Sequence, residues 1–199
     1  MNALIYTNEY PPYNYGGAGV HVEYLTRELS KLPGLDVDVR AFGEHESSGY
    51  PLKVSGYPVD TKAFGAPKFL QSIFGSSQRA ISFNADGNEA DVVHCHTWYT
   101  HLAGIMTKLN YGIPLVITAH SLEPLRPWKR EQLGRGYDAS SWVEKTAIEM
   151  ADAIIAVSEE TKEDVLKYFN VDEDKIQVIY NGINLSQYKK VEGTSVMKE

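Results

Sequence analysis

The sequence predicts a Rossmann-like α/β fold, in which helices cover both faces of a parallel sheet. Strand-like and helix-like segments alternate along most of the chain, which is the pattern of repeated β-α units. The strand-like segments are short, continuous apolar runs, as expected for strands buried on both faces. Polar or glycine-rich loops follow several of these runs. A length of 199 residues fits one ordinary domain.

The first half of the chain gives five predicted elements. Val22, Leu25, Leu29 and Leu32 recur at three- and four-residue spacing, which marks one face of a helix that ends before Pro33. In order, we predict a strand at 3–7, a helix through 22–32, a strand at 35–42, a polar loop or hairpin at 44–55 and a helix around 69–81.

The second half repeats the pattern more clearly. Gly112 stands where a helix C-terminal cap is expected, Ser141 and Glu144 have capping-box spacing, and Ser158 is placed to cap another helix. In order, we predict a strand at 91–95, a helix through 102–111, a strand at 114–119, a helix from 141 to about 150, a strand at 153–157, a helix from 158 to 169 and a strand at 175–180. We expect residues 1–185 to form one domain and 186–199 to be a linker or tail.

Composition excludes several classes of protein. The net charge is −7 and no basic stripe offsets it, so we expect no nucleic-acid partner. Cys95 is the single cysteine, which excludes a disulfide framework. No apolar run approaches the ~20 residues of a membrane span, and the first residues lead into a strand without signal-peptide features. We expect a cytoplasmic protein without a membrane partner.

Three loops carry the candidate binding and catalytic residues. They cover 8–19, 94–99 and 118–129, and each follows a predicted strand. Ligands of open parallel sheets bind outside the carboxyl ends of the strands. Gly16 and Gly17 let a ligand approach the backbone at a helix start, where free N–H groups suit a phosphate. A tight packing turn explains the same glycines equally well.

The histidines of the second loop raise the question of a metal. His94 and His96 share a strand face, but His101 falls in the next helix and Cys95 points to the opposite face, so we expect no metal site. We expect His96 and Trp98 to line a cleft instead. A half-buried core position is the ordinary alternative for Trp98.

The third loop begins with a histidine at the end of a strand. His120 can be a core residue, an acid or base, or a donor to a substrate hydroxyl, and its place favours a role in a site. Arg126 and Lys129 are either surface charges or cations held for an anion or an acceptor. Asn181 fits two interpretations equally well, a turn residue and a site residue. We expect His120 and the paired glycines to open onto one groove.

Taken together, the motifs resemble the N-terminal half of retaining GT-B-type glycosyltransferases, family four in particular, which includes glycogen synthases and maltose-1-phosphate synthases. The string 119–129, Ala-His-Ser-Leu-Glu-Pro-Leu-Arg-Pro-Trp-Lys, is the most specific motif. The other segments that carry the resemblance are 9–12, 15–22, 94–99, 141–144, 156–158 and 181–183.

The resemblance implies an acceptor-side domain that works with a C-terminal domain beyond residue 199. Such an enzyme moves glucose with retention from a nucleotide sugar, ADP-glucose by analogy, to an α-1,4-glucan, without a metal or a cofactor. The alternatives are a maltose-1-phosphate synthase, with a sugar-phosphate acceptor, and a non-catalytic glucan-binding domain.

The resemblance also implies roles for individual residues. His120 would be catalytic beside the transferred sugar, and Gly16 and Gly17 would approach the donor phosphates. His96, Trp98 and Asn181 would line the sugar side of the cleft. The chain alone would be inactive, because both walls of the cleft position the donor.

Overall fold

The computed structural model describes residues 1–46 and 48–184, so the predicted linker at 186–199 lies outside the described residues. The described strands are β1 (Asn2–Thr7), β2 (Asp36–Phe42), β3 (Leu52–Tyr57), β4 (Val92–His96), β5 (Leu115–Ala119), β6 (Ala153–Ala156) and β7 (Ile176–Val178). The α-helices are α1 (Gly17–Leu29), α2 (Gln71–Ala85), α3 (Trp98–Tyr111), α4 (Lys129–Leu133), α5 (Gly136–Met150) and α6 (Glu159–Tyr168). Single 3₁₀ turns cover Thr61–Ala63, Lys68–Leu70, Glu123–Leu125 and Glu173–Lys175.

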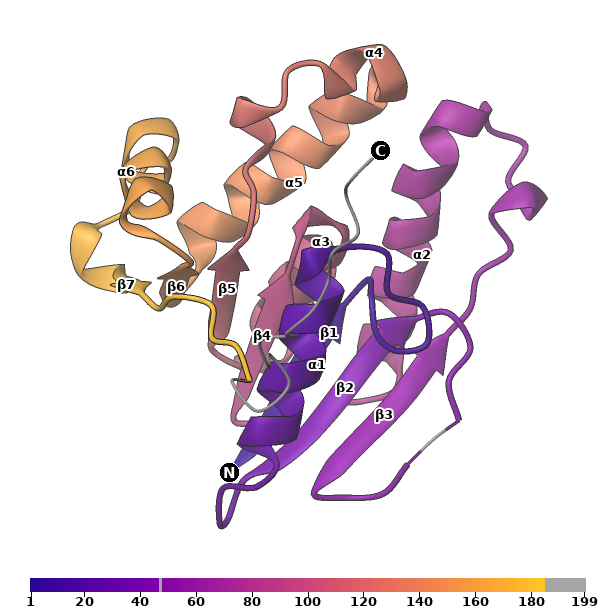
Figure 1. Ribbon diagram of the computed structural model, residues 1–199. Coiled ribbons are helices and arrows are strands. Elements are labelled where there is room, and N and C mark those ends of the chain that lie inside the picture. Colours follow the sequence, from indigo (N-terminus) through magenta and orange to yellow (C-terminus); the bar gives the residue numbers. More distant parts are fainter. Residues whose placement is uncertain (47, 185–199) are drawn as a thin grey trace, which may run out of the picture.

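The strands form one parallel sheet in the order β3-β2-β1-β4-β5-β6-β7, which confirms the predicted fold class (Figure 1). β1 lies between β2 and β4, so the chain leaves β1 in one direction along the sheet and later returns to add strands on the other side. This change of direction opens a crevice at the carboxyl ends of the strands, where open α/β sheets bind their ligands.

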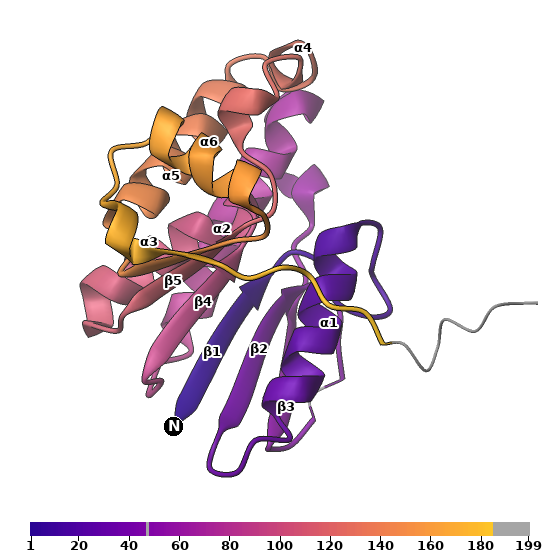
Figure 2. The same ribbon diagram turned by 60° about the vertical axis from the view of Figure 1, so that its left-hand side comes forward.

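Helices cover the two faces unequally. α1 packs over β1 and β2 on one face, around Val22, and α2, α3 and α5 cover the other face with the larger part of the core (Figures 1 and 2). In β4, Val93 and Cys95 point into the larger core, because side chains alternate along a strand. His94 and His96 therefore lie on the α1 side, where fewer helices cover the sheet.

Two predicted helix ends are confirmed in detail. Gly112 follows α3 with φ 69° and donates its N–H to the carbonyl of Lys108, as a left-handed C-terminal cap does. Ser158 precedes α6, and its hydroxyl accepts the N–H of Thr161 at 3.1 Å.

Two element predictions are wrong. Part of the predicted loop at 44–55 is the edge strand β3, whose six residues are all only half-buried and so give no clear apolar alternation. α5 begins at Gly136 instead of Ser141. The capping-box carboxylate, Glu144, accepts the backbone N–H of Glu123 at 2.6 Å, so it anchors a distant loop and caps no helix.

Within the described residues, no helix combines the length and the apolar character needed to cross a bilayer.

Candidate functional site

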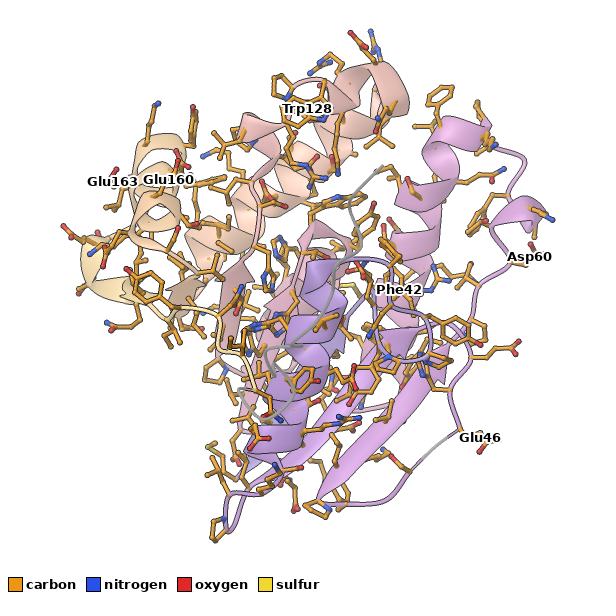
Figure 3. The ribbon with its side chains drawn as sticks, viewed as in Figure 1. Phe42, Glu46, Asp60, Trp128, Glu160 and Glu163 are labelled. Atoms are coloured by element: carbon orange, nitrogen blue, oxygen red, sulfur yellow. The ribbon has the colours of Figure 1, made fainter. Side chains whose placement is uncertain are left out.

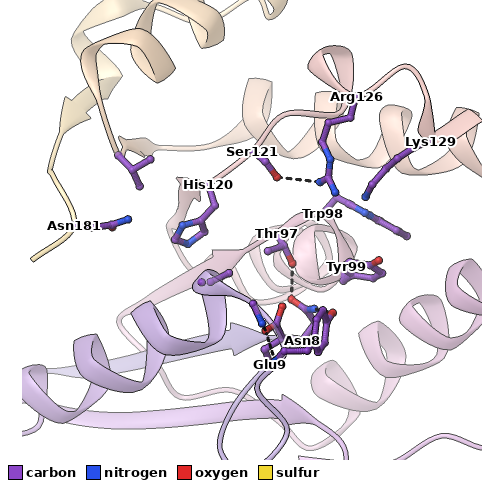
Figure 4. Close-up of a pocket in the computed structure, with 15 residues that line it drawn as sticks. Asn8, Glu9, Thr97, Trp98, Tyr99, His120, Ser121, Arg126, Lys129 and Asn181 are labelled. Carbon is purple, nitrogen blue, oxygen red and sulfur yellow. Dashed lines mark hydrogen bonds between the residues drawn. The ribbon is translucent and has the colours of Figure 1, made fainter. Parts of the chain in front are cut away.

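One cavity of ≈ 460 Å³ lies at the carboxyl ends of the strands, and all three predicted loops contribute to it (Figure 4). The loop after β1 supplies its floor, the loops after β4 and β5 supply its walls, and residues after β6 and β7 close one side. The lining residues are Asn8, Glu9, Tyr15, Gly16, Gly17, Ala18, Thr97, Trp98, Tyr99, His120, Ser121, Arg126, Lys129, Val157 and Asn181. His120 and the paired glycines thus open onto one groove, as predicted.

The glycines of the first loop serve two purposes. A Cβ on Gly16 would meet Glu9 Oε1 at 3.3 Å, and one on Gly19 would meet Glu9 Cβ at 2.7 Å, so these two glycines let the loop close around Glu9. A Cβ on Gly17 would meet nothing within 4 Å, since Gly17 faces the open cavity. Both interpretations of the glycines, packing and ligand approach, therefore apply to different residues.

A buried carboxylate already occupies the start of the loop. Glu9 is 4% exposed, and its Oε2 accepts the N–H groups of Tyr15 at 3.1 Å and Gly16 at 2.7 Å. The first turn of α1, from Gly17 onward, has N–H groups with no partner inside the helix. An anion in the cavity would therefore meet the helix at Gly17 and Ala18, one residue further than the sequence indicates.

His120 directly follows β5 and lines the cavity, whereas His96 does not. His96 is fully buried, and its Nδ1 lies 3.0 Å from Nε2 of His120. Burial, and to a smaller extent the proximity of His21, lower the pKa of His120 to about 4, so the ring is neutral at pH 7. A neutral imidazole acts as a hydrogen-bonding group and not as an acid at this pH.

Trp98 is mainly a core residue. It is 4% exposed, and its ring stacks on Tyr99 with 4.1 Å between ring centroids. Only an edge of Trp98 reaches the cavity, where Tyr99 lies beside it in Figure 4. The outer Trp128 is 55% exposed and projects from the far end of the loop before α4 (Figure 3).

Arg126 and Lys129 are held in place rather than free on the surface. Both approach the same buried oxygen, Glu123 Oε1, with Lys129 Nζ at 3.5 Å and Arg126 Nη1 at 3.8 Å. Arg126 also donates to the Ser121 hydroxyl at 3.0 Å. Figure 4 shows both cations on the opposite side of the cavity from His120, with their side chains extending toward Tyr99.

On the wall formed by Arg126 and Lys129, the positive charge is larger than the negative charge of the neighbouring carboxyl groups. Burial raises the pKa of Glu144, next to Glu123, to about 8, so Glu144 is mainly neutral at pH 7. Arg126 and Lys129 therefore share the single negative charge of Glu123. Glu9 faces the same cavity from the loop after β1, so the excess positive charge is confined to the wall that carries Arg126 and Lys129, where it suits an anionic ligand.

Asn181 reaches the cavity from the segment after β7. This segment runs across the ends of the strands toward α1 (Figure 2), and Asn181 lies close enough to His21 of α1 to raise its pKa, against the larger lowering by burial. His21 packs edge-on against His120, with 4.8 Å between ring centroids. The residue thus joins the last strand to the first helix at one end of the cavity, in addition to lining it.

The three histidines that come together differ from those weighed in the sequence. Among the described residues, ligand nitrogens of His21, His96 and His120 lie within 4.8 Å of one another, and His94 and His101 stay outside this group. The 3.0 Å contact between His96 and His120 is a hydrogen-bond distance, shorter than the ~3.3 Å between two nitrogens on one tetrahedral zinc ion. The contact therefore fits two rings that share a proton.

Thr97 has a strained backbone at the turn from β4 to α3. Its φ of 67° with ψ of 154° is a conformation that glycine adopts almost exclusively. The Thr97 hydroxyl donates to Asn8 Oδ1 at 2.7 Å, which ties the loops after β4 and β1 together at the cavity wall. Strain of this kind costs about 1–3 kcal/mol.

We predict that Thr97→Gly is more stable than Thr97→Ala by about 1–2 kcal/mol, after the entropic cost of glycine. Both variants lose the hydrogen bond to Asn8, but only glycine relieves the strained φ. Urea unfolding of the two variants measures the difference. Equal stabilities, or a more stable alanine variant, would show that the turn carries no strain.

Sequence reasoning missed several residues of the site. Asn8, Glu9, Tyr15, Tyr99 and Ser121 also line the cavity, and all of them lie in the three loops that the sequence singles out. His21 was missed as well, because it stands among the apolar positions of α1 and no local signal shows that it faces the histidines of β4.

Comparison with known proteins gives one family. The model of Glycosyltransferase Family 4 matches residues 15–187. An alpha-maltose-1-phosphate synthase of Mycolicibacterium smegmatis is 48% identical over 193 residues, which are 96% of this chain and 47% of that protein. A glycogen synthase of Mycobacterium tuberculosis is 25% identical over 208 residues, with 94% and 50% covered. The chain spans about half the length of these curated relatives.

The solved structures agree on the fold. A sucrose-phosphate synthase of Thermosynechococcus elongatus matches with a TM-score of 0.70 and 15% identity, over 96% of this chain and 51% of that one. At this identity the match supports the fold and carries no information on substrates.

Proposed function

Because the chain belongs to glycosyltransferase family 4, we propose that it is the acceptor-side half of a glucosyltransferase that makes maltose 1-phosphate. The full enzyme would move glucose, with retention, from a nucleotide sugar such as ADP-glucose to glucose 1-phosphate. The relative named maltose-1-phosphate synthase is far more similar than the one named glycogen synthase, which supports this order of preference. Glycogen elongation is the second candidate.

The observation that carries the proposal is the arrangement of the cavity. His120 and Gly17 both line it, and Arg126 and Lys129 lie on the opposite side of the cavity from His120. A glucan acceptor is neutral and makes no use of two fixed cations. A sugar phosphate matches them, since arginine and lysine form strong charge-assisted hydrogen bonds with phosphate.

In this proposal the neutral ring of His120 binds the transferred glucosyl group and stabilises it as positive charge develops on the sugar. The N–H groups at the start of α1 receive the donor phosphates. The second half of the enzyme holds the nucleotide, so the chain alone binds the acceptor and transfers nothing.

The test uses a chimera in which this chain is followed by the part of the M. smegmatis relative that it does not match. With ADP-glucose and equal concentrations of glucose 1-phosphate and glycogen, we expect maltose 1-phosphate as the main product. Elongated glycogen as the main product would favour the second candidate. Binding of maltooligosaccharides without any transfer would favour a non-catalytic glucan-binding domain.

Arg126→Ala sharpens the test. We expect the KM for glucose 1-phosphate to rise by about 10–100-fold, because a hydrogen bond to a charged group contributes about 1.5–3 kcal/mol. Arg130→Ala is the matched control, since Arg130 is paired with Asp138 on the surface and does not line the cavity. An equal, small effect of both substitutions on KM would refute the phosphate role of Arg126.

A further inference from the structure

Four polar side chains form a row on the α1 face of the sheet, and the row ends in the cavity. His94 and His96 of β4 and Thr118 of β5 share this face, because residues two apart in a strand point the same way. His94 Nε2 lies 2.7 Å from the Thr118 hydroxyl, and the rings of His94 and His96 are 4.2 Å apart. His96 Nδ1 then meets His120 Nε2 at 3.0 Å.

Every histidine in this row is neutral at physiological pH. Burial lowers the pKa of His94 to about 3 and of His120 to about 4, and it holds the pKa of His96 well below the usual range. A neutral imidazole has one N–H donor and one nitrogen lone pair. The contact between His96 and His120 therefore has two possible arrangements, which differ in the ring that donates.

The surroundings of His96 distinguish the two arrangements. Its other nitrogen, Nε2, is buried and has no hydrogen-bond partner among the described residues. If His120 donated, the proton of His96 would lie on Nε2 as a buried N–H without an acceptor, which costs about 1–3 kcal/mol. If His96 donates from Nδ1, only a lone pair is left unpaired, and proteins tolerate that more readily.

We infer that His96 is a positioning residue that fixes His120 in the tautomer with its proton on Nδ1. His96 donates to Nε2 of His120, so Nδ1–H is the donor left to face a ligand in the cavity that His120 lines. His21 packs over both rings from α1, with ring centroids 4.8 Å from His120 and 5.5 Å from His96, and restricts their movement.

The consequence is a site that recognises a hydrogen-bond acceptor atom of the ligand. A fixed Nδ1–H can donate to a sugar hydroxyl oxygen or to an oxygen that gains negative charge, and it cannot accept a proton from a substrate. The identity of that ligand rests on the proposed function. The tautomer itself does not, because it follows from the buried contacts alone.

Long-range ¹H–¹⁵N correlation spectra of the ¹⁵N-labelled chain at pH 7 test the inference. These spectra distinguish a protonated Nδ1 from a protonated Nε2 in each ring. We expect Nδ1–H for both His96 and His120. A protonated Nε2 on His120 would overturn the inference, and this measurement needs neither a variant nor a substrate.

Two substitutions then separate positioning from packing. His96→Asn keeps an N–H donor near the position of Nδ1, and His96→Leu removes it. We expect His120 to stay in the Nδ1–H form in the asparagine variant and to become a mixture of tautomers in the leucine variant. In the chimera, kcat should fall about 10-fold for leucine with little change in KM, and asparagine should restore most of it.

His101→Leu is the matched control. His101 is a fully enclosed histidine of α3 whose nitrogens have no hydrogen-bond partner among the described residues. Its removal should leave the tautomer of His120 unchanged. Identical His120 spectra for the two His96 variants would refute the positioning role. The expected tautomers in a chimera without transfer activity would refute the proposed function and leave the inference standing.

Discussion

Replacing His120 with alanine in the chimera should lower kcat for glucosyl transfer by about 10²–10³-fold, the effect expected when one preorganised donor to a developing charge is lost. KM should change much less, because the interaction strengthens in the transition state and is weaker in the bound substrate. The physical basis is the position of the ring, which lines the cavity at the end of β5 and is held from behind by His96.

His120→Asn and His45→Ala complete this experiment. Asparagine places an amide N–H near the position of Nδ1, so it should recover part of the lost kcat. His45 lies in the loop after β2, where its ring contacts Tyr10 and Tyr13 and does not line the cavity, so His45→Ala should transfer glucose at the wild-type rate. A His120→Ala enzyme that retains wild-type kcat would remove this residue from the reaction.

The second large effect is a loss of stability in acid. Burial lowers the pKa of His94 and His101 to about 3 and that of His120 to about 4. In the unfolded chain these rings take up protons below pH ~6.5, so the unfolded state binds more protons. The stability that the neutral rings contribute is complete above that pH and is lost as the pH falls toward 4.

Each such ring changes the free energy of unfolding by about 1.4 kcal/mol per pH unit. The three together with His96, whose pKa is also well below the usual range, change it by about 5.6 kcal/mol per unit. Glu144 acts in the opposite direction. Its folded pKa of about 8 lies above the ordinary value, so its contribution is complete below pH ~4.5 and is lost as the pH rises toward 8. The net expected slope between pH 6 and 4.5 is about 4 kcal/mol per unit.

Urea unfolding of the chain at several pH values from 7 to 4.5 measures this slope. A domain of ordinary stability, about 5–15 kcal/mol, would lose much or all of it over this range. His101→Leu should reduce the slope by about 1.4 kcal/mol per unit, because it removes one buried titrating ring without touching the cavity. A stability that is independent of pH over this interval would contradict the neutral histidine row.

Much of the site could be predicted from the sequence because parallel strands bring their carboxyl ends to one edge. That rule placed His120, Gly17, Arg126 and Lys129 at one cavity without any distance information. The same rule also predicted that His96 lines the cavity, which is wrong, because side chains alternate between the two faces of a strand. His96 is the last residue of β4, and its side chain turns into the layer between the sheet and α1.

Other features depend on contacts between distant segments. Glu9 becomes a buried carboxylate only because Gly16 and Gly19 fold back over it, and His21 meets His120 only because α1 packs on the face of the sheet to which His96 points. Ser141 and Glu144 have the spacing of a helix start, yet Glu144 accepts the N–H of Glu123, 21 residues away. Local spacing could not distinguish these partners from nearby ones.

A crystal structure of the chimera with bound ADP-glucose is the most direct measurement. The account predicts the glucosyl ring in the cavity of Figure 4, with a sugar oxygen within hydrogen-bond distance of His120 Nδ1 and the diphosphate near Gly17. A glucosyl group bound elsewhere, with the cavity filled by solvent alone, would contradict it.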